Sequence, residues 1–261
     1  MLTLEKMQGN WALVTGASSG IGAEFCQQFA KLGINLVMVS RNAEKINALS
    51  ARLEAINKIK TIVISVDLSD PMSADKIYQE VERRNVRIRM LINNAALCYA
   101  GQFDGETNEF YSKMINVNCL TPIVLSKCLL PHLKSFEDSL ILNVSSGAAY
   151  QPVPYLGIYA ASKSFIHMAS QALYGELREE GIMVKTFIPA PTNTSIASNK
   201  AYSGKLEKVE ITVSKALKIL ENDDPMLMTA KNVWLQKLFV AFLPAKKLIM
   251  EAGKMFKPNR N

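Results

Sequence analysis

The feature that most constrains this fold is a regular alternation between short apolar runs and longer segments with helical periodicity. The apolar runs are continuous in Val, Ile and Leu, as strands buried on both faces of a parallel sheet usually are. Such runs lie at 11–15, 35–40, 61–66, 90–92, 140–145 and 183–188, and the helical patterns between them lie at 21–32, 43–56, 72–84, 108–133 and 158–180. The order predicts an α/β fold with helices on both faces of one parallel sheet and right-handed crossovers.

The chain has 261 residues, of which 49% are apolar and 20% charged, and this composition is that of a globular protein. No internal repeat or linker divides it, so we expect one domain over 1–230 followed by an appendage at 231–261. The apolar runs are shorter than the ~20 residues that span a membrane, and the first ten residues lack the apolar segment of a signal peptide. Four cysteines without metal or disulfide spacing indicate free thiols, so we expect a cytoplasmic protein.

A glycine-rich turn follows the first predicted strand and leads directly into a helical pattern. Residues 15–22 read TGASSGIG, with the spacing Gly-x-x-x-Gly-x-Gly. Glycines allow a tight turn and a close approach to a pyrophosphate, and the N–H groups at the helix N-terminus attract phosphate. A simple strand-to-helix turn is the alternative, but the place after the first strand favours a dinucleotide site.

The end of the second predicted strand indicates which dinucleotide fits. An acidic residue there would bind the ribose 2′-hydroxyl of NAD, whereas a basic residue suits the 2′-phosphate of NADP. This chain has Ser40 and then Arg41. We therefore expect NADP(H) as the cofactor, with NAD(H) less favoured; the alternative is that Arg41 is a solvated loop charge.

Polar residues also follow the later strands. Asp67 and Asn94 come after the third and fourth strands, and Ser146 after the fifth. Ligands of open α/β sheets bind at these carboxyl ends. Thirteen residues after Ser146, Tyr159 and Lys163 open a helix at positions i and i+4, so both project from one face. The i, i+4 spacing alone is weak evidence of a catalytic role, but the place of the pair in a predicted cofactor-binding fold favours one.

Together these elements resemble the short-chain dehydrogenase/reductase family, from residue 11 to about residue 195. The resemblance implies a doubly wound, Rossmann-like parallel sheet of about seven strands, and carbonyl–alcohol interconversion by hydride transfer. It also implies a catalytic group of Asn118, Ser146, Tyr159 and Lys163. The expected cofactor-binding residues are Gly16, Ser18, Ser19, Gly20, Ile21, Gly22, Arg41, Asp67, Leu68, Asn94, Ala95, Tyr159, Lys163, Pro189, Thr192 and Thr194.

The roles within the catalytic group follow from its chemistry. Tyr159 would exchange a proton with the substrate oxygen, and Ser146 would hydrogen-bond that oxygen. The ammonium of Lys163 and an oxidised nicotinamide would both lower the tyrosine pKa from its usual ~10. Asn118 lies in a helical pattern that contains Pro122, which has no N–H. We therefore expect a kink that frees the Asn118 carbonyl to hold a water. The resemblance implies that such a water links Asn118 to the lysine.

The chain departs from the family's pattern in three places. Ala96 and Ala190 stand where the family usually has glycine, after the fourth and sixth strands. The C-terminus, with a short candidate strand at 226–229 before two basic apolar helices, resembles the branch near 3-oxoacyl and 17-beta-hydroxysteroid reductases. The region near 193–225 is the expected substrate lid, and nothing in it names a substrate; a hydrophobic or acyl-type ketone fits the branch.

The net charge of +7 is concentrated at the C-terminus. Segment 231–261 has seven basic residues and one acidic residue, hence +6, and the other 230 residues carry +1. A nucleic-acid binder with an overall basic surface is therefore excluded. Two interpretations of the tail stay open: packing on the core or a partner subunit, or contact with a membrane surface or lipid-like substrate.

Two function classes remain. The first is an active NADP(H)-dependent carbonyl reductase with a small-molecule substrate, expected to be a homo-oligomer; the second is a catalytically silent nucleotide-binding sensor or scaffold of the same fold. The complete Ser-Tyr-Lys-Asn group favours the enzyme. No metal site is expected, since the only histidines, His132 and His167, both lie in helical patterns.

Overall fold

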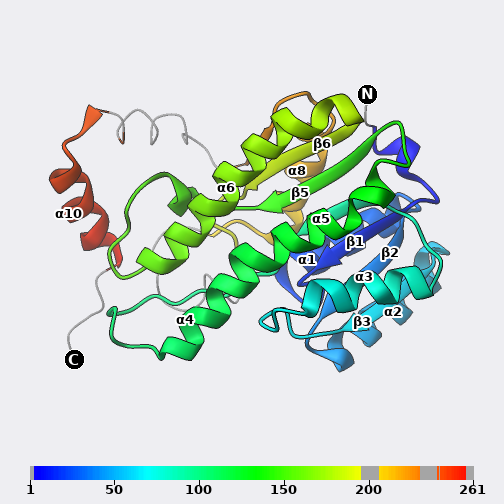
Figure 1. The fold of residues 1–261 in the computed structure, drawn as a ribbon, viewed down its shortest axis with the longest axis horizontal. Helices are drawn as coiled ribbons and strands as arrows, with labels where there is room; N and C mark the ends of the chain where they lie inside the picture. The colour runs from blue at the N-terminus through cyan, green and yellow to red at the C-terminus, as the bar shows by residue number, and fades with distance from the viewer. Residues whose placement is uncertain (1–2, 195–205, 230–239, 241, 257–261) are drawn as a thin grey trace.

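The computed structural model describes residues 3–194, 206–229, 240 and 242–256, and its centre is a seven-stranded parallel sheet (Figure 1). The strands are β1 (Trp11–Thr15), β2 (Asn35–Ser40), β3 (Thr61–Ser65), β4 (Ile88–Asn93), β5 (Ser139–Val144), β6 (Ile182–Ile188) and β7 (Met226–Met228), in the order β3-β2-β1-β4-β5-β6-β7. The predicted fold class is confirmed.

Helices cover both faces of the sheet. The buried apolar side chains of α1 (Gly20–Lys31), α2 (Ala43–Asn57) and α8 (Val209–Leu220) join one core cluster. Those of α3 (Ser73–Arg83) and α5 (Thr121–Leu133) join the other, together with the C-terminal end of α6 (Gly157–Leu177). Strand side chains alternate between the two clusters, as Ala12, Leu13 and Val14 of β1 do. This two-sided burial explains the continuous apolar runs in the sequence.

The strand order places a crevice beside β1. The chain continues from β1 to β2 on one side and returns to β4 on the other, so the connections leave the carboxyl ends of β1 and β4 in opposite directions. Such a switch point is where doubly wound sheets bind ligands. Every motif found in the sequence lies at this end of the sheet.

The helical pattern at 108–133 is interrupted rather than simply kinked. Helix α4 (Asn108–Ile115) passes into a five-residue π-helix, η2 (Asn116–Leu120), before α5 begins. The N–H of Thr121 donates to the carbonyl of Asn116, five residues back. Because Pro122 cannot donate to Asn118, the widened turn is the physical form that the predicted kink takes.

Helix 108–133 is also, among the described residues, the one helix long and apolar enough to span a membrane by length and composition. Half of its most apolar window is buried inside the fold. It belongs to the core layer with α3 and α6, and a core helix passes the same criterion.

Several elements lie outside the sequence predictions. Helix α8 falls in the expected lid region 193–225, of which 195–205 lie outside the described residues. Short 3-10 helices at Glu5–Met7 and Gly147–Tyr150 were not predicted. Of the two expected tail helices, the second is α10 (Ala245–Phe256), and most of the first lies outside the described residues.

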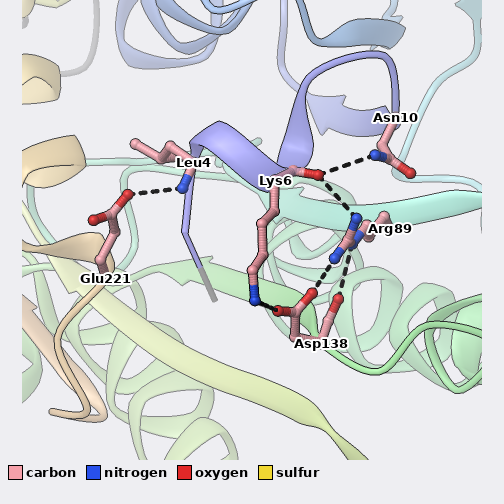
Figure 2. Close-up of polar contacts among 6 residues, drawn as sticks. All are labelled: Leu4, Lys6, Asn10, Arg89, Asp138 and Glu221. Carbon is pink, nitrogen blue, oxygen red and sulfur yellow. Dashed lines mark hydrogen bonds and ion pairs between the residues drawn. The ribbon is translucent and has the colours of Figure 1, made fainter. Parts of the chain in front are cut away.

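A polar cluster at the amino ends of β4 and β5 holds the N-terminal segment on the body (Figure 2). Arg89 pairs with the Asp138 carboxylate and donates 2.9 Å hydrogen bonds to the carbonyls of Asp138 and Lys6. The Leu4 N–H donates to Glu221, just after α8, at 2.7 Å. The cluster is at the end of the sheet opposite the motifs, so its role is to fix the scaffold.

Candidate active site

One cavity of about 760 Å³ lies at the carboxyl ends of the strands. Among the predicted site residues, all except Gly22 and Asn118 line it. The glycine-rich turn and the end of β2 form one part of the wall, and the start of α6 with the segment after β5 forms another. The fold thus brings residues from 16 to 194 of the sequence to one hollow.

The glycine-rich turn forms a cradle that side chains would fill if other residues replaced the glycines. Gly16 and Gly20 have φ of +67° and +55°, a region that favours glycine. A Cβ on Gly16 would approach the Asn94 side-chain nitrogen to 2.8 Å. Gly22 does not line the cavity; a Cβ there would lie 2.4 Å from the Gly16 carbonyl oxygen, so its role is the close packing of α1 on the turn. The cradle at the N-terminus of α1 fits a dinucleotide pyrophosphate.

The strand ends around the cradle are locked by hydrogen bonds that the sequence did not reveal. The Thr15 hydroxyl accepts from the N–H groups of Asn94 and Ala95 at 3.0 and 3.1 Å. The Asn94 amide donates to the Thr15 carbonyl at 2.9 Å. Asn94 and Ala95 therefore reach the cavity wall from a loop that β1 holds in place.

At the far end of the cradle lie Ser18, Ser40 and Arg41. The two serine hydroxyls form a 2.7 Å hydrogen bond, and Arg41 is exposed at the cavity wall. Burial opposes ionisation of Asp67, but hydrogen bonds from Ser69 and the charges of Arg41 and Lys113 outweigh it, so the pKa of the Asp67 carboxyl is lowered. No carboxylate occupies the Ser40 position, and this end of the cavity carries an accessible guanidinium.

Ser146, Tyr159 and Lys163 meet at the opposite part of the wall. Ser146 is hydrogen-bonded to Tyr159, and Lys163 has its ammonium 5.9 Å from the centre of the tyrosine ring. The ammonium donates to the carbonyl of Val144, the last residue of β5, at 2.9 Å. Tyr159 and Lys163 are both buried, at 9% and 3% exposure, so helix α6 holds the pair rigidly against the end of β5.

Burial dominates the electrostatics of this pair. It raises the pKa of Tyr159 above its ordinary value, and the hydrogen bond from Ser146 opposes that shift only in part. The expected lowering by Lys163 is therefore wrong for the protein alone, because desolvation of the phenolate is the larger effect. Burial also lowers the pKa of Lys163 to about 8. At neutral pH the tyrosine therefore keeps its proton.

Asn118 does not line the cavity itself, but it supports this wall through hydrogen bonds. Its side chain accepts from the Leu97 N–H at 2.8 Å and donates to the Leu97 carbonyl at 2.9 Å and to the Ser162 hydroxyl at 2.9 Å. A second cavity, about 10 Å³, is lined by both Asn118 and Lys163. Its size is near the minimum that one water needs. The sequence predicted a water at the carbonyl, but not the side chain's hold on the Leu97 loop.

The departures from the family's pattern are accommodated in the wall. Ala96 and Ala190 both line the cavity. The Ala190 N–H donates to the Thr229 hydroxyl at 3.0 Å, and its carbonyl accepts from the Thr192 hydroxyl at 2.6 Å. Thr192 in turn contacts Thr212 of α8 at 3.1 Å, so the segment after β6 is fixed without a glycine.

Sequence reasoning missed the apolar part of the cavity wall. These residues come from the loops after β4 and β5 and from distant parts of the chain: Leu97, Cys98, Ala148, Val153, Leu156, Leu206 and Phe256. Only the helical stripe of the tail gave a signal for Phe256. Within the part of the chain that the structure describes, no group of three or more His, Cys, Asp or Glu side chains is placed to hold a metal.

Comparison with known proteins agrees with this geometry. The sequence model of the short chain dehydrogenase family matches residues 10–203. The human very-long-chain 3-oxoacyl-CoA reductase is 31% identical over 220 residues, 80% of this chain and 68% of that protein. The chicken hydroxysteroid dehydrogenase-like protein 1 is 32% identical, over 78% of this chain and 62% of its own.

A solved relative has the same architecture. The structure of a short-chain dehydrogenase from Sphingobium yanoikuyae in complex with NADPH has a TM-score of 0.79 and 28% identity, and it covers 90% of this chain and 96% of its own. The sheet order, the glycine cradle and the wall with Ser146, Tyr159 and Lys163 all support the same family assignment. The chain belongs to the short-chain dehydrogenase/reductase family of oxidoreductases that interconvert carbonyl and alcohol groups, near the 3-oxoacyl and hydroxysteroid reductases.

Proposed function

We propose that this enzyme is an NADP(H)-dependent reductase of a hydrophobic, acyl-type ketone. The observation that carries the proposal is a single cavity that joins a phosphate cradle and an accessible arginine to a buried tyrosine–lysine pair with an apolar wall beside it. Each part has a chemical counterpart in a dinucleotide and a ketone. The roles below are assigned on that basis.

The cofactor, when bound, supplies the hydride for reduction. Tyr159 donates its phenolic proton to the carbonyl oxygen, so that the C=O double bond becomes an alcohol C–OH bond. Ser146 donates a hydrogen bond to the same oxygen and holds it within reach of the tyrosine. Lys163 and the small cavity beside Asn118 offer the path by which the phenolate regains a proton.

Arg41 supports the preference for NADP(H) over NAD(H). The guanidinium is exposed at the adenosine end of the cavity, and the position that would hold a ribose-binding acid is Ser40. A phosphate at this end would meet a fixed positive charge and the Ser18 and Ser40 hydroxyls. The Sphingobium relative was solved with NADPH.

The apolar wall supports a hydrophobic substrate. Apart from Gln151 and Cys98, the side chains of this part of the wall are hydrocarbon, and none of them carries a charge. A carboxylate or sugar placed there would lose its hydration without a partner. The printed name of the human relative describes a reductase of very-long-chain 3-oxoacyl-CoA, and an acyl-type ketone fits such a wall.

The test is consumption of NADPH and of NADH by the purified protein with a panel of ketones that ranges from short polar ketones to long-chain 3-oxoacyl thioesters. The proposal expects turnover that is greatest for NADPH with apolar ketones. Absence of turnover with every ketone, together with tight NADPH binding, would support the silent sensor instead.

We also propose cytoplasmic placement and peripheral contact of 231–261 with an anionic membrane. The four cysteines are free thiols, as in a reducing compartment. On α10 the lysines Lys246, Lys247 and Lys254 are exposed, and Phe242 and Met250 beside them are 82% and 60% exposed. Apolar and cationic groups add their effects at a lipid surface. Salt-sensitive binding to anionic vesicles, absent with neutral vesicles, is the expected result; no binding at low salt would contradict it.

We also propose that the protein forms a homo-oligomer. Helix α6 exposes Phe165 at 49% and Met168 at 65% on one face, where a second copy could cover them. Sedimentation that shows a dimer or tetramer would support this, and a monomer at micromolar concentration would not.

A further inference from the structure

Helix α10 reaches the substrate end of the cavity although it comes almost a hundred residues after Tyr159. Leu248 and Ala252, four residues apart, are buried at 9% and 3%, and Phe256 continues the same stripe. Figure 1 shows α10 at the end of the molecule away from the N-terminus, beside the loop that leads into α6. The inner face of α10 is therefore packed on the catalytic domain.

The contact between α10 and that loop is close. A Cβ added to Gly253 would come within 3.3 Å of the Pro154 side chain, so the absence of a side chain lets the helix backbone approach the loop. Pro154 lies between Val153 and Leu156, which both line the cavity. The packing sets how far the last turn of α10 reaches over the cavity.

Phe256, in that last turn, lines the cavity and contacts the apolar cluster that contains Tyr159. The buried members of this cluster are Met114, Val153, Leu156, Tyr159 and Ala160. Hydrocarbon groups that extend from a carbonyl at Tyr159 toward this wall would meet the phenyl ring.

We propose that Phe256 is the residue that sets the length and bulk of the apolar group that the enzyme accepts on its ketone. The inference rests on the proposed function for its substrate, an apolar ketone. The ring closes the apolar end of the cavity, and its position is fixed by the stripe of α10 and by the Gly253–Pro154 contact. A smaller side chain at 256 lengthens this end, and a larger one shortens it.

The test uses straight-chain methyl ketones of increasing length with wild type, Phe256→Ala and Phe256→Trp. In Phe256→Ala the chain length with the highest kcat/KM moves to longer ketones, with a gain of about fourfold for each further methylene that becomes buried. Phe256→Trp moves the optimum to shorter ketones. KM for NADPH stays within about twofold of wild type in both, because α10 touches the wall far from the phosphate cradle.

Ile249→Ala is the matched control, since Ile249 lies on the same helix, is 37% exposed and does not line the cavity. It leaves the chain-length profile unchanged. If neither Phe256 variant shifts the profile, or Ile249→Ala shifts it as much, the proposal is wrong.

Calorimetric titration with straight-chain 1-alkanols separates this proposal from the proposed function. The dependence of alkanol affinity on chain length moves with the side chain at 256 even if wild type reduces no ketone. An enzyme without ketone turnover whose alkanol profile still responds to Phe256 would refute the proposed reaction and keep the apolar wall; an alkanol profile identical in all variants would refute the role of Phe256.

Discussion

Burial changes the pKa of two residues in the candidate active site. Burial raises the pKa of Tyr159 and lowers that of Lys163 to about 8, so at neutral pH the tyrosine keeps its proton and most of the lysine carries its charge. Residue type and spacing alone suggested that the lysine would lower the tyrosine pKa. Desolvation, which depends on the packing of α6 against β5, is not readable from the i, i+4 spacing, and it reverses the sign.

The pH dependence follows from Lys163. As pH rises above about 8, the ammonium loses its proton. The positive charge that we propose attracts the bound cofactor is lost with it. We expect kcat/KM for NADPH, which reports the free enzyme, to decrease from about pH 8 to about pH 10. Stability moves the other way: a lysine whose pKa is lower in the folded than in the unfolded chain adds stability as pH rises between the two values.

Lys185 provides the control for this prediction. Its pKa is also lowered to about 8, mainly by burial, but it bonds Asn222 and Asp224 and does not line the cavity. Lys185→Gln should keep the alkaline decrease of kcat/KM. A profile that stays flat to pH 10 in wild type, or a decrease that disappears in Lys185→Gln, would contradict the assignment to Lys163.

Cofactor preference is a second property that we expect to depend on a single residue, Arg41. The substitution Arg41→Asp would remove the charge-assisted contact that we propose with the 2′-phosphate, and it would add repulsion. Such a contact is worth roughly 1.5–3 kcal/mol, so the wild-type preference for NADPH in kcat/KM should be about tenfold to a hundredfold. In the Arg41→Asp variant this preference should vanish or reverse. Lys45→Asp makes the same charge change on α2 outside the cavity and should leave the preference intact. Equal kcat/KM for both cofactors in wild type would refute the role of Arg41.

At the scale of elements, the π-helix η2 ties three parts of the site together. Through its side chain Asn118 joins this turn to Leu97 in the cavity wall and to Ser162 on α6. The proline in the sequence predicted a kink here, and the structure has a π-helix at this place. The partners of the asparagine side chain come from loops far away in the chain, and no local pattern specifies them.

Asn118→Ala should therefore lower both stability and turnover. The Leu97 N–H and carbonyl would lose their partners, and buried unpaired groups cost about 1–3 kcal/mol each, so the free energy of unfolding should fall by about 2–6 kcal/mol. Turnover should fall more than cofactor affinity, since Leu97 lies by the catalytic wall. Denaturant unfolding and steady-state kinetics measure both.

Asn116→Ala is the comparison within the same π-helix. The Asn116 amide donates one 3.0 Å hydrogen bond to the Ser69 carbonyl on the other side of the helix. Its loss should cost about 1 kcal/mol with little change in turnover. If the two variants behave alike, Asn118 has only a structural role.

At the scale of the whole molecule, the parallel sheet and its helices follow from the sequence because two-sided burial leaves continuous apolar runs. Most strand and helix limits were predicted to within one or two residues. The site residues at strand ends were predicted because topology alone brings carboxyl ends together. The apolar wall was not predicted from the sequence. Leu206 and Phe256 reach it through tertiary packing of the C-terminal part, which carries no motif.

The substitution Tyr159→Phe tests the central claim most directly, because it removes one hydroxyl and leaves Lys163, the cradle and the apolar wall in place. For the best ketone of the panel, turnover with NADPH should fall by at least about a hundredfold, the usual contribution of a general acid. The NADPH dissociation constant, measured by fluorescence titration, should stay within about twofold of wild type. A variant that keeps half of the wild-type turnover would contradict the account, because the proton would then come from another group.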